Sequence, residues 1–158
     1  MSEIDPYETS DRRYPRVITM NEILSLPRLA FQPGIGTAIF LSQERDDARY
    51  FRQGICWQTV DHVPYQWHQT NFDETHYCLK GKIRLVVKDA EGRKIVLEAA
   101  QGEHIYLPGG YEYTLEPTGV ETAFFWTSGP SPRYGLAEIP NYSDSLTALR
   151  DGGGNDHT

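Results

Sequence analysis

The sequence predicts a single all-β domain, a sandwich or a barrel, and two observations carry this prediction. Short apolar segments recur at regular spacing between residues 55 and 126, and breaks rich in glycine or proline separate them. Short strands joined by tight turns are typical of closed or double-sheet β folds. The length of 158 residues is sufficient for one hydrophobic core and too short for two.

The first part of the chain is expected to precede the main sheet. Residues 1–15 predict a flexible lead, and Arg16–Thr19 predict a strand. Asn21 is in position to cap a short helical turn that runs through Leu26 and stops at Pro27. After it, Thr37–Leu41 predicts a short apolar strand, and the charged stretch Ser42–Arg49 predicts a loop.

Seven further strands are expected from alternating or apolar patterns, and glycine or proline turns separate them. The strands are Ile55–Val60, Glu74–Leu79, Ile83–Val87, Ile95–Glu98, His104–Leu107, Tyr111–Leu115 and Thr122–Trp126. The turns are Asp89–Gly92, which closes a hairpin, Gln101–Gly102, Pro108–Gly110 and Pro117–Gly119. We expect the domain to span residues 16–135, followed by an extension over 136–158 in which Ser143–Arg150 forms a helical turn and 151–158 is disordered.

Charge and cysteine content exclude several function classes. The net charge of −7 disfavours nucleic acid and anionic membranes, because both require a basic patch. No apolar run is long enough to span a bilayer, and the acidic N-terminus does not have the pattern of a secretory signal. Cys56 and Cys78 lie in apolar strand segments, so we expect two buried free thiols and a cytoplasmic protein.

Two spaced motifs define a more specific fold. The first is Glu74, six residues, Gly81; the second is Gly102, five residues, Pro108-x-Gly110, two residues, Tyr113. In this order, with a hairpin between them, they resemble the paired motifs of the cupin superfamily. That resemblance covers roughly residues 50–127 and implies a double-stranded β-barrel, or jelly roll, with its functional site in the barrel interior.

Within the superfamily, the sequence most resembles the ethanolamine-utilisation cupin family. The residues that carry this likeness are Asn71-Phe72-Asp73-Glu74, the hairpin at Gly81, and Gly102 followed by Leu107-Pro108-x-Gly110. A shorter likeness, from Trp67 to Gly81, is to ectoine synthase, a cupin lyase.

The metal ligands implied by the superfamily are largely replaced. Metal-binding cupins place two histidines before the first-motif glutamate, where this chain has either Trp67 and Gln69 or His68 and Thr70. The second-motif histidine position holds Tyr113. The candidate metal donors are therefore Glu74, His76, His68 and Tyr113. They predict at most a weakly bound divalent ion, such as iron, zinc or manganese.

Alternation along the first-motif strand predicts a different kind of site. If Glu74 points into the barrel, His76 and Cys78 do so too, because side chains in a strand alternate between faces. A carboxylate and an imidazole two residues apart on one face suit general acid–base chemistry. By the same alternation, Ile105 and Leu107 face inward and His104 and Tyr106 outward, while His62 is expected at the surface.

The function predicted from these residues is acid–base chemistry on a small polar metabolite, with Glu74, His76 and Tyr113 as catalytic candidates. A lyase or isomerase fits better than a dioxygenase, because oxygen chemistry requires a firmly held redox metal. Two alternatives remain open: a non-catalytic ligand-binding or scaffold protein, and a metal-dependent enzyme with Glu, His and Tyr ligands. Besides the small-molecule ligand, a homodimer is expected, with the apolar segment Ile23–Phe31 lying across a second subunit.

Overall fold

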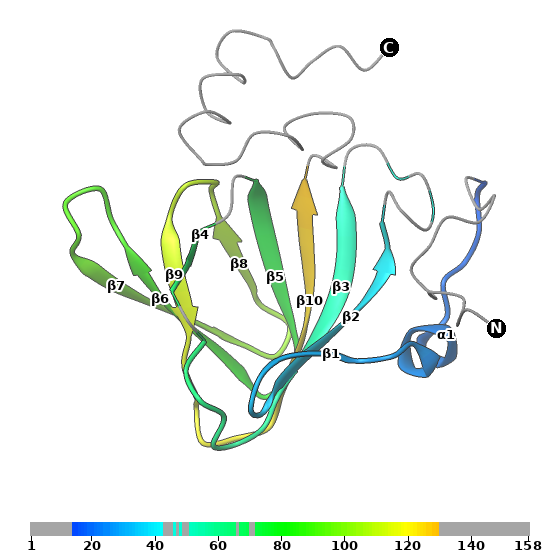
Figure 1. Ribbon diagram of the computed structural model, residues 1–158, viewed down its shortest axis with the longest axis horizontal. Helices are drawn as coiled ribbons and strands as arrows, with labels where there is room; N and C mark the ends of the chain where they lie inside the picture. The colour runs from blue at the N-terminus through cyan, green and yellow to red at the C-terminus, as the bar shows by residue number, and fades with distance from the viewer. Residues whose placement is uncertain are drawn as a thin grey trace, which may run out of the picture.

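The computed structural model describes residues 14–42, 46, 48, 51–65, 67–69 and 72–129. It contains one short helix and ten strands in this part of the chain (Figure 1). The elements are α1 (Met20–Ser25), β1 (Leu29–Gln32), β2 (Ile35–Leu41), β3 (Arg52–Gln58), β4 (His68–Gln69), β5 (Asp73–Lys80), β6 (Lys82–Lys88), β7 (Lys94–Ala100), β8 (His104–Leu107), β9 (Glu112–Leu115) and β10 (Thr122–Gly129). Within the described residues, no helix is both long and apolar enough to cross a membrane.

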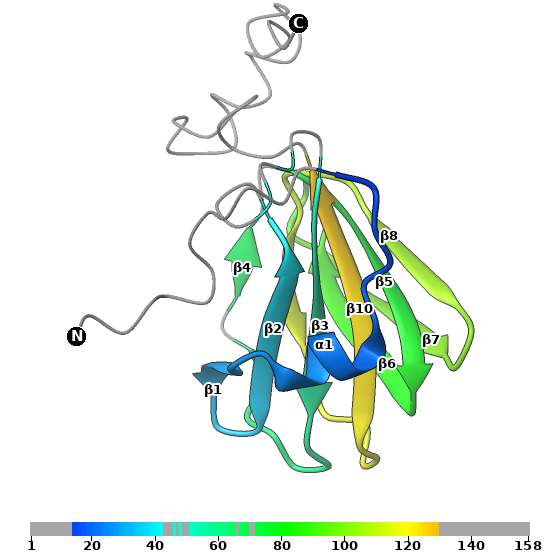
Figure 2. The same ribbon diagram turned by 90° about the vertical axis from the view of Figure 1, so that its right-hand side faces the viewer.

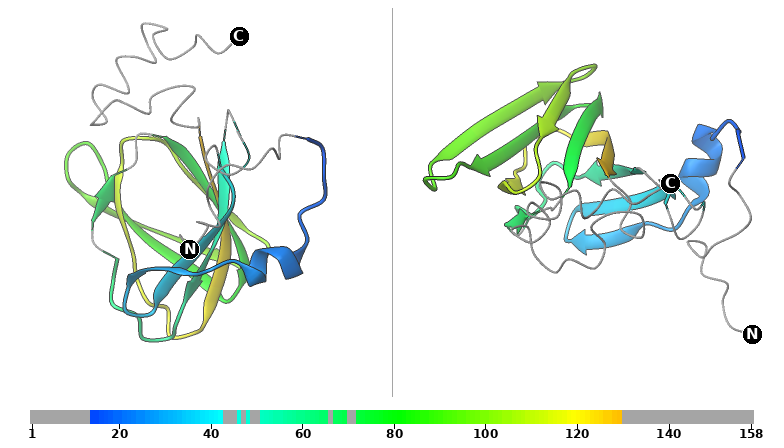
Figure 3. Two further views of the ribbon diagram at one scale, coloured as in Figure 1. Left: turned by 45° about the vertical axis from the view of Figure 1, so that its right-hand side comes forward. Right: turned by 90° about the horizontal axis from the view of Figure 1, so that it is seen from above.

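The strands form two antiparallel sheets that face each other, as Figure 3 shows in the view from above. The first sheet has six strands in the order β1-β2-β3-β10-β5-β8, and the second has four in the order β4-β9-β6-β7. From β3 on, every connection passes from one sheet to the other except the β6–β7 hairpin. This is the all-β jelly roll that the sequence predicts.

The segment before the sheet differs from the prediction in two details. Arg16–Thr19 is not a strand, and Thr19 rather than Asn21 caps α1. Thr19 has an extended backbone, and its hydroxyl accepts a hydrogen bond from the Glu22 backbone N–H at 3.2 Å. This bond satisfies a helix N–H that has no partner inside the helix, so the helix begins directly after Thr19.

Most predicted strands are present with their ends shifted by a few residues. The largest shift is at β3, which begins at Arg52 and ends at Gln58, whereas the pattern predicts Ile55–Val60. The sequence pattern missed β1 and the two-residue β4, because both are too short to show an alternation of their own. Most of the predicted 1–15 lead, most of the 42–49 loop, and the extension after residue 129 lie outside the described residues.

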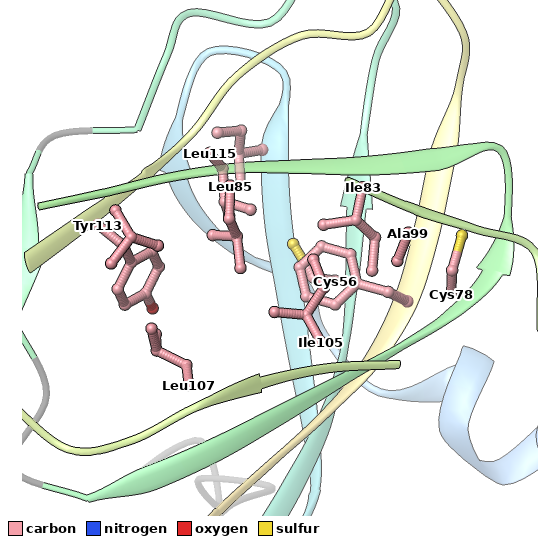
Figure 4. Packing of buried hydrophobic residues seen from close by; sticks show 12 residues of the cluster. Cys56, Cys78, Ile83, Leu85, Ala99, Ile105, Leu107, Tyr113 and Leu115 are labelled. Atoms are coloured by element: carbon pink, nitrogen blue, oxygen red, sulfur yellow. The ribbon is translucent and has the colours of Figure 1, made fainter. Parts of the chain in front are cut away.

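The hydrophobic core fills the space between the two sheets. Figure 4 shows this cluster, with Tyr113 at one end and Cys78 at the other. Its members are Ile35, Cys56, Cys78, Ile83, Leu85, Val87, Ala99, Ile105, Leu107, Tyr113, Leu115 and Phe124. Both cysteines are buried and free, as the sequence predicts.

A second, smaller cluster covers the outer face of the six-stranded sheet. Helix α1 lies against this face (Figure 2), where Ile23 packs with Ala38, Phe40 and Ile55. Burial on both faces holds β2 and β3 firmly in place. The inner face of these strands is therefore a rigid wall for whatever lies inside the barrel.

Candidate functional site

A cavity of about 270 Å³ opens at the Tyr113 end of the core. Its apolar and aromatic lining consists of Ile39, Cys56, Tyr65, Leu115, Phe124 and Trp126, and its polar lining consists of Arg52, His68, Glu74, His76 and Tyr113. Since one water occupies about 30 Å³ in the liquid, the cavity holds a molecule of roughly nine non-hydrogen atoms. All four predicted site residues therefore line one small space.

The strand β5 presents its side chains as the sequence predicts. Glu74, His76 and Cys78 are buried, with 9%, 2% and 0% of their surface exposed, while the residues between them are more exposed. Glu74 and His76 line the cavity, but Cys78 lies at the far end of the core (Figure 4) and does not. On β8, Ile105 and Leu107 face inward and their two neighbours outward, also as predicted.

The centre of the site is the carboxylate oxygen Oε2 of Glu74. It lies 3.2 Å from Nε2 of His76 and 3.3 Å from the hydroxyl of Tyr113. An ionised carboxylate can only accept, so the imidazole N–H and the phenol O–H both donate to it. His76 comes from the same strand as Glu74, and Tyr113 comes from β9 in the opposite sheet.

The second ring nitrogen of His76 takes no part in the hydrogen bond to Glu74. Its Nδ1 is buried and has no hydrogen-bond partner in the described part of the chain. The ring is held by packing instead, stacked on Phe124 with 5.0 Å between centroids and edge-on to Tyr113 at 6.1 Å. The imidazole is therefore fixed in place while one nitrogen remains available for a proton.

Tyr113 is a neutral phenol in this environment. Burial raises its pKa well above the ordinary value near 10, and the negative charge of Glu74, the neighbouring Tyr65 and the hydrogen bond to Glu74 raise it further. The pKa of Tyr65 is raised by the same two leading causes, burial and then the charge of Glu74. Tyr113 thus serves as a hydrogen-bond donor that holds the Glu74 carboxylate in position.

His68 lies at the edge of the cavity. It pairs with Tyr113 in the β4–β9 ladder, and the two rings meet edge to face with 5.6 Å between centroids. The residue is exposed and lines the cavity, so it lies at the cavity mouth. The neighbouring Trp67 instead lies outside the cavity, with the Lys88 ammonium 4.0 Å from its ring centre.

Arg52 is a cavity residue that the sequence analysis missed. It lies at the start of β3, before the predicted beginning of that strand. Alternation from the buried Cys56 back through Gly54 would have placed Arg52 on the inner face, had the strand been extended by three residues. Its guanidinium lies 5.8 Å from the ring centre of Phe72 and 6.0 Å from that of Trp126.

Trp126 forms one wall of the cavity because Gly54 leaves room for it. A Cβ atom at Gly54 would lie 2.4 Å from the indole ring, so any other residue would displace the ring. The indole N–H crosses this gap and donates to the Thr37 hydroxyl on β2 at 2.9 Å. These contacts with β2 and β3 fix the indole ring of Trp126. In the sheet register Trp126 is paired with His76 of β5, so the fixed ring lies beside the imidazole.

His62 is not at the surface as predicted but buried, with 3% of its area exposed. The loop after β3 folds back under the β1–β2 turn, where Thr59 N–H donates to the Gly34 carbonyl at 2.9 Å and Val63 N–H to the Pro33 carbonyl at 3.2 Å. These bonds enclose His62, whose Nδ1–H donates to the Val63 carbonyl at 2.9 Å. It does not line the cavity.

The donors in the cavity do not fit a firmly held metal ion. Among the described residues, no group of three or more His, Cys, Asp or Glu side chains is placed to hold one. Oε2 of Glu74 already accepts two hydrogen bonds, and Tyr113 keeps its proton. A neutral phenol is a poor ligand, so the buried donors Glu74 and His76 would approach an ion from one strand, with only the exposed His68 to add to them.

The two sheets have the architecture of the cupin fold, and similarity to a solved structure confirms that fold. Oxalate decarboxylase from Bacillus subtilis, in a structure at pH 4.6, matches with a TM-score of 0.61 and 14% identity, over 82% of this chain and 35% of that one. The EutQ protein of Clostridium difficile matches with a TM-score of 0.49 and 20% identity, over 61% of this chain and 63% of that one. The chain thus spans about a third of the oxalate decarboxylase chain and less than two thirds of EutQ.

Oxalate decarboxylase is a cupin, so the resemblance predicted from the two motifs is confirmed at the level of the fold. No protein-family model matches the sequence, and no curated protein matches it. At such low identity the likeness establishes the architecture alone. The chemistry depends on the residues that line the cavity.

Proposed function

We propose that the protein is a small-molecule cupin enzyme of the ethanolamine-utilisation type that transfers a proton on a small polar metabolite bound in the cavity. One observation carries the proposal: Oε2 of Glu74 accepts hydrogen bonds from both His76 and Tyr113 at the wall of a cavity of about 270 Å³. A buried carboxylate that only stabilised the fold would have no reason to line a space large enough for a ligand.

Glu74 is the proposed acid–base group. Its carboxylate removes a proton from a bound substrate and returns it at another position, or to a leaving group. The imidazole N–H of His76 stabilises the carboxylate through the Nε2–Oε2 hydrogen bond, and Tyr113 keeps the carboxylate oriented. Removal of a proton followed by its return, or by loss of a leaving group, is the chemistry of an isomerase or a lyase.

No step in this proposal passes through a metal ion, since the donors do not fit one that is firmly held. The weak or substoichiometric divalent ion predicted from the sequence remains a prediction, as do the homodimer and the cytoplasmic location. Phe124, Leu115 and Trp126 surround the carboxylate with apolar side chains, and in such surroundings its interaction with a bound polar molecule is stronger than in water.

The test uses a mixture of small polar metabolites, followed by proton NMR before and after incubation with the protein. The wild type should convert at least one component into a new species, because a lyase or isomerase changes its substrate without a second reactant. Glu74→Gln should abolish the conversion, and Glu121→Gln, a matched change at an exposed position, should retain it. Binding without conversion by the wild type would overturn the enzymatic proposal in favour of a ligand-binding protein.

A further inference from the structure

The cavity contains a cation that the acid–base triad does not use. Arg52 lines the cavity from β3, and its Nε is buried without a hydrogen-bond partner in the described part of the chain. Within the same residues its guanidinium forms no ion pair, and it lies 5.8 Å from the ring centre of Phe72 and 6.0 Å from that of Trp126. A cation partly withdrawn from water without an anion is costly, so an anion bound beside Arg52 would stabilise its guanidinium.

The sheet register places Arg52 and Glu74 in one row. Ser128 on β10 pairs with Arg52 on one side and with Glu74 on the other. Residues directly opposite each other in antiparallel strands have side chains on the same face, and adjacent strands lie about 4.8 Å apart. Arg52 and Glu74 therefore emerge from the inner wall roughly 10 Å apart, with Ser128 between them.

Ser128 adds a second unpartnered polar group to this row. It is 1% exposed, and its Oγ has no hydrogen-bond partner among the described residues. A hydroxyl can donate to an anion bound beside it. Ser128 does not line the cavity, but the register places it directly beside Arg52, which does. The planar guanidinium can bind a carboxylate with two N–H groups, and the hydroxyl is a further donor next to it.

Building on the proposed function, we infer that the cavity binds a small monocarboxylate, with Arg52 as its anchor and Ser128 as a second donor. The carboxylate lies at the Arg52 end of the row, and the carbon that exchanges a proton lies at the Glu74 end. A second carboxylate on the ligand would face the negative charge of Glu74, so dicarboxylates are disfavoured. The cavity volume of about 270 Å³ limits the ligand to a compact acid.

The test compares propionate, its neutral isostere propionamide, and malonate, titrated into isotope-labelled protein at pH 7 and followed by amide NMR shifts. Propionate should bind more tightly than the other two. Arg52→Gln should weaken propionate roughly 10- to 100-fold, the range expected for a charged hydrogen bond, without changing propionamide binding. Arg52→Lys should retain part of the affinity, and Ser128→Ala should cause a smaller loss than Arg52→Gln.

Arg28→Gln is the matched control, because Arg28 is an exposed arginine that stacks on Trp57 at 3.9 Å, outside the cavity. It should leave propionate binding unchanged. Thermal melting of each variant checks that the fold is intact, and Arg52→Lys keeps the test decisive if Arg52→Gln does not fold. Equal binding of propionate and propionamide, or unchanged propionate binding in Arg52→Gln, would overturn the inference.

The failure of this inference and that of the proposed function are distinguishable. If the wild type binds propionate through Arg52 but converts no component of the metabolite mixture, Arg52 is confirmed as the carboxylate-binding residue and the enzymatic proposal is wrong. If conversion depends on Glu74 but involves uncharged substrates and persists in Arg52→Gln, the enzymatic proposal is confirmed and the inferred role of Arg52 in carboxylate binding is wrong.

Discussion

Tyr113 and Glu74 are joined across the two sheets by a single hydrogen bond. The phenol of β9 donates to the carboxylate of β5 at 3.3 Å, between residues 39 positions apart in the sequence. The bond has two consequences. It fixes the carboxylate in the cavity, and it makes the stability of the barrel depend on the protonation of Tyr113.

The first prediction follows from the raised pKa of Tyr113. In the unfolded chain its phenol ionises near pH 10, whereas burial and the charge of Glu74 hold the pKa in the folded protein well above that value. The stabilising effect is therefore complete below about pH 10 and is lost as the pH rises toward the folded-state pKa. Between pH 10 and 11 the wild type should lose about 1 kcal/mol more stability than Tyr113→Phe.

Urea unfolding of both proteins at pH 9, 10 and 11 provides the measurement. The difference between the two proteins isolates Tyr113 from every other group that titrates in this range. Parallel losses in the two proteins would mean that the phenol ionises as freely in the folded protein as in the unfolded chain.

The second prediction concerns the close approach of Trp126 to Gly54. Gly54→Ala should destabilise the protein by about 2 kcal/mol, because the added methyl group would occupy the position of the indole ring. The indole N–H signal of Trp126 should shift as its hydrogen bond to Thr37 is disturbed. Gly36→Ala is the matched control in the neighbouring strand, where a Cβ would meet nothing closer than 3.5 Å and the change should be within about 0.5 kcal/mol.

The third prediction concerns metal content. Protein purified without added metal should contain a divalent ion weakly or substoichiometrically, as measured by element analysis, because Glu74 and His76 come from the same strand and the further imidazole, His68, lies in an exposed position. Glu74→Ala and His76→Ala should each abolish whatever binding is present, and His68→Ala reports whether the donors extend to the cavity mouth. Full occupancy that survives dialysis against a chelator would contradict this reading of the donors.

The fourth prediction is the homodimer expected from the apolar segment Ile23–Phe31. Since Ile23 packs against the sheet of its own chain, we expect the exposed apolar residues of and before α1 to meet the partner. Met20 and Leu24 are one helical turn apart on α1, with 44% and 53% of their surfaces exposed, and Val17 before them is 82% exposed. Light scattering at micromolar concentration should give twice the monomer mass. Leu24→Asp should shift the mass toward the monomer, and Val120→Asp, a change at an exposed apolar residue before β10, should not. A monomer mass for the wild type would refute the prediction.

The sequence was sufficient to predict the residues whose positions depend on local pattern. Alternation along β5 placed Glu74 and His76 inside the barrel, and motif spacing placed Tyr113 opposite them. These predictions needed only the two-residue period of a strand and the order of two motifs. The hydrogen bonds of His76 and Tyr113 to the same oxygen of Glu74 depend on how distant strands pair, and no local sequence pattern contains that information.

The residues that were missed depend on tertiary structure. Arg52 enters the cavity because pairing with β10 extends β3 toward the N-terminus, beyond the apolar stretch that marked its core. His62 is buried because its loop folds back on the Gly34 turn, through backbone hydrogen bonds that leave no mark in the sequence. In both cases the deciding interaction is with a segment far away in the chain.

The central claim is that Glu74 transfers a proton to and from a bound small molecule. The most direct measurement is deuterium incorporation from D₂O at a carbon of a bound metabolite, followed by NMR for wild type and Glu74→Gln. The wild type should incorporate deuterium, and Glu74→Gln should lose this incorporation at least about 100-fold, within the usual range for removal of a general base. Equal incorporation by the two proteins would contradict the account, as would a bound metabolite that the wild type leaves fully protonated.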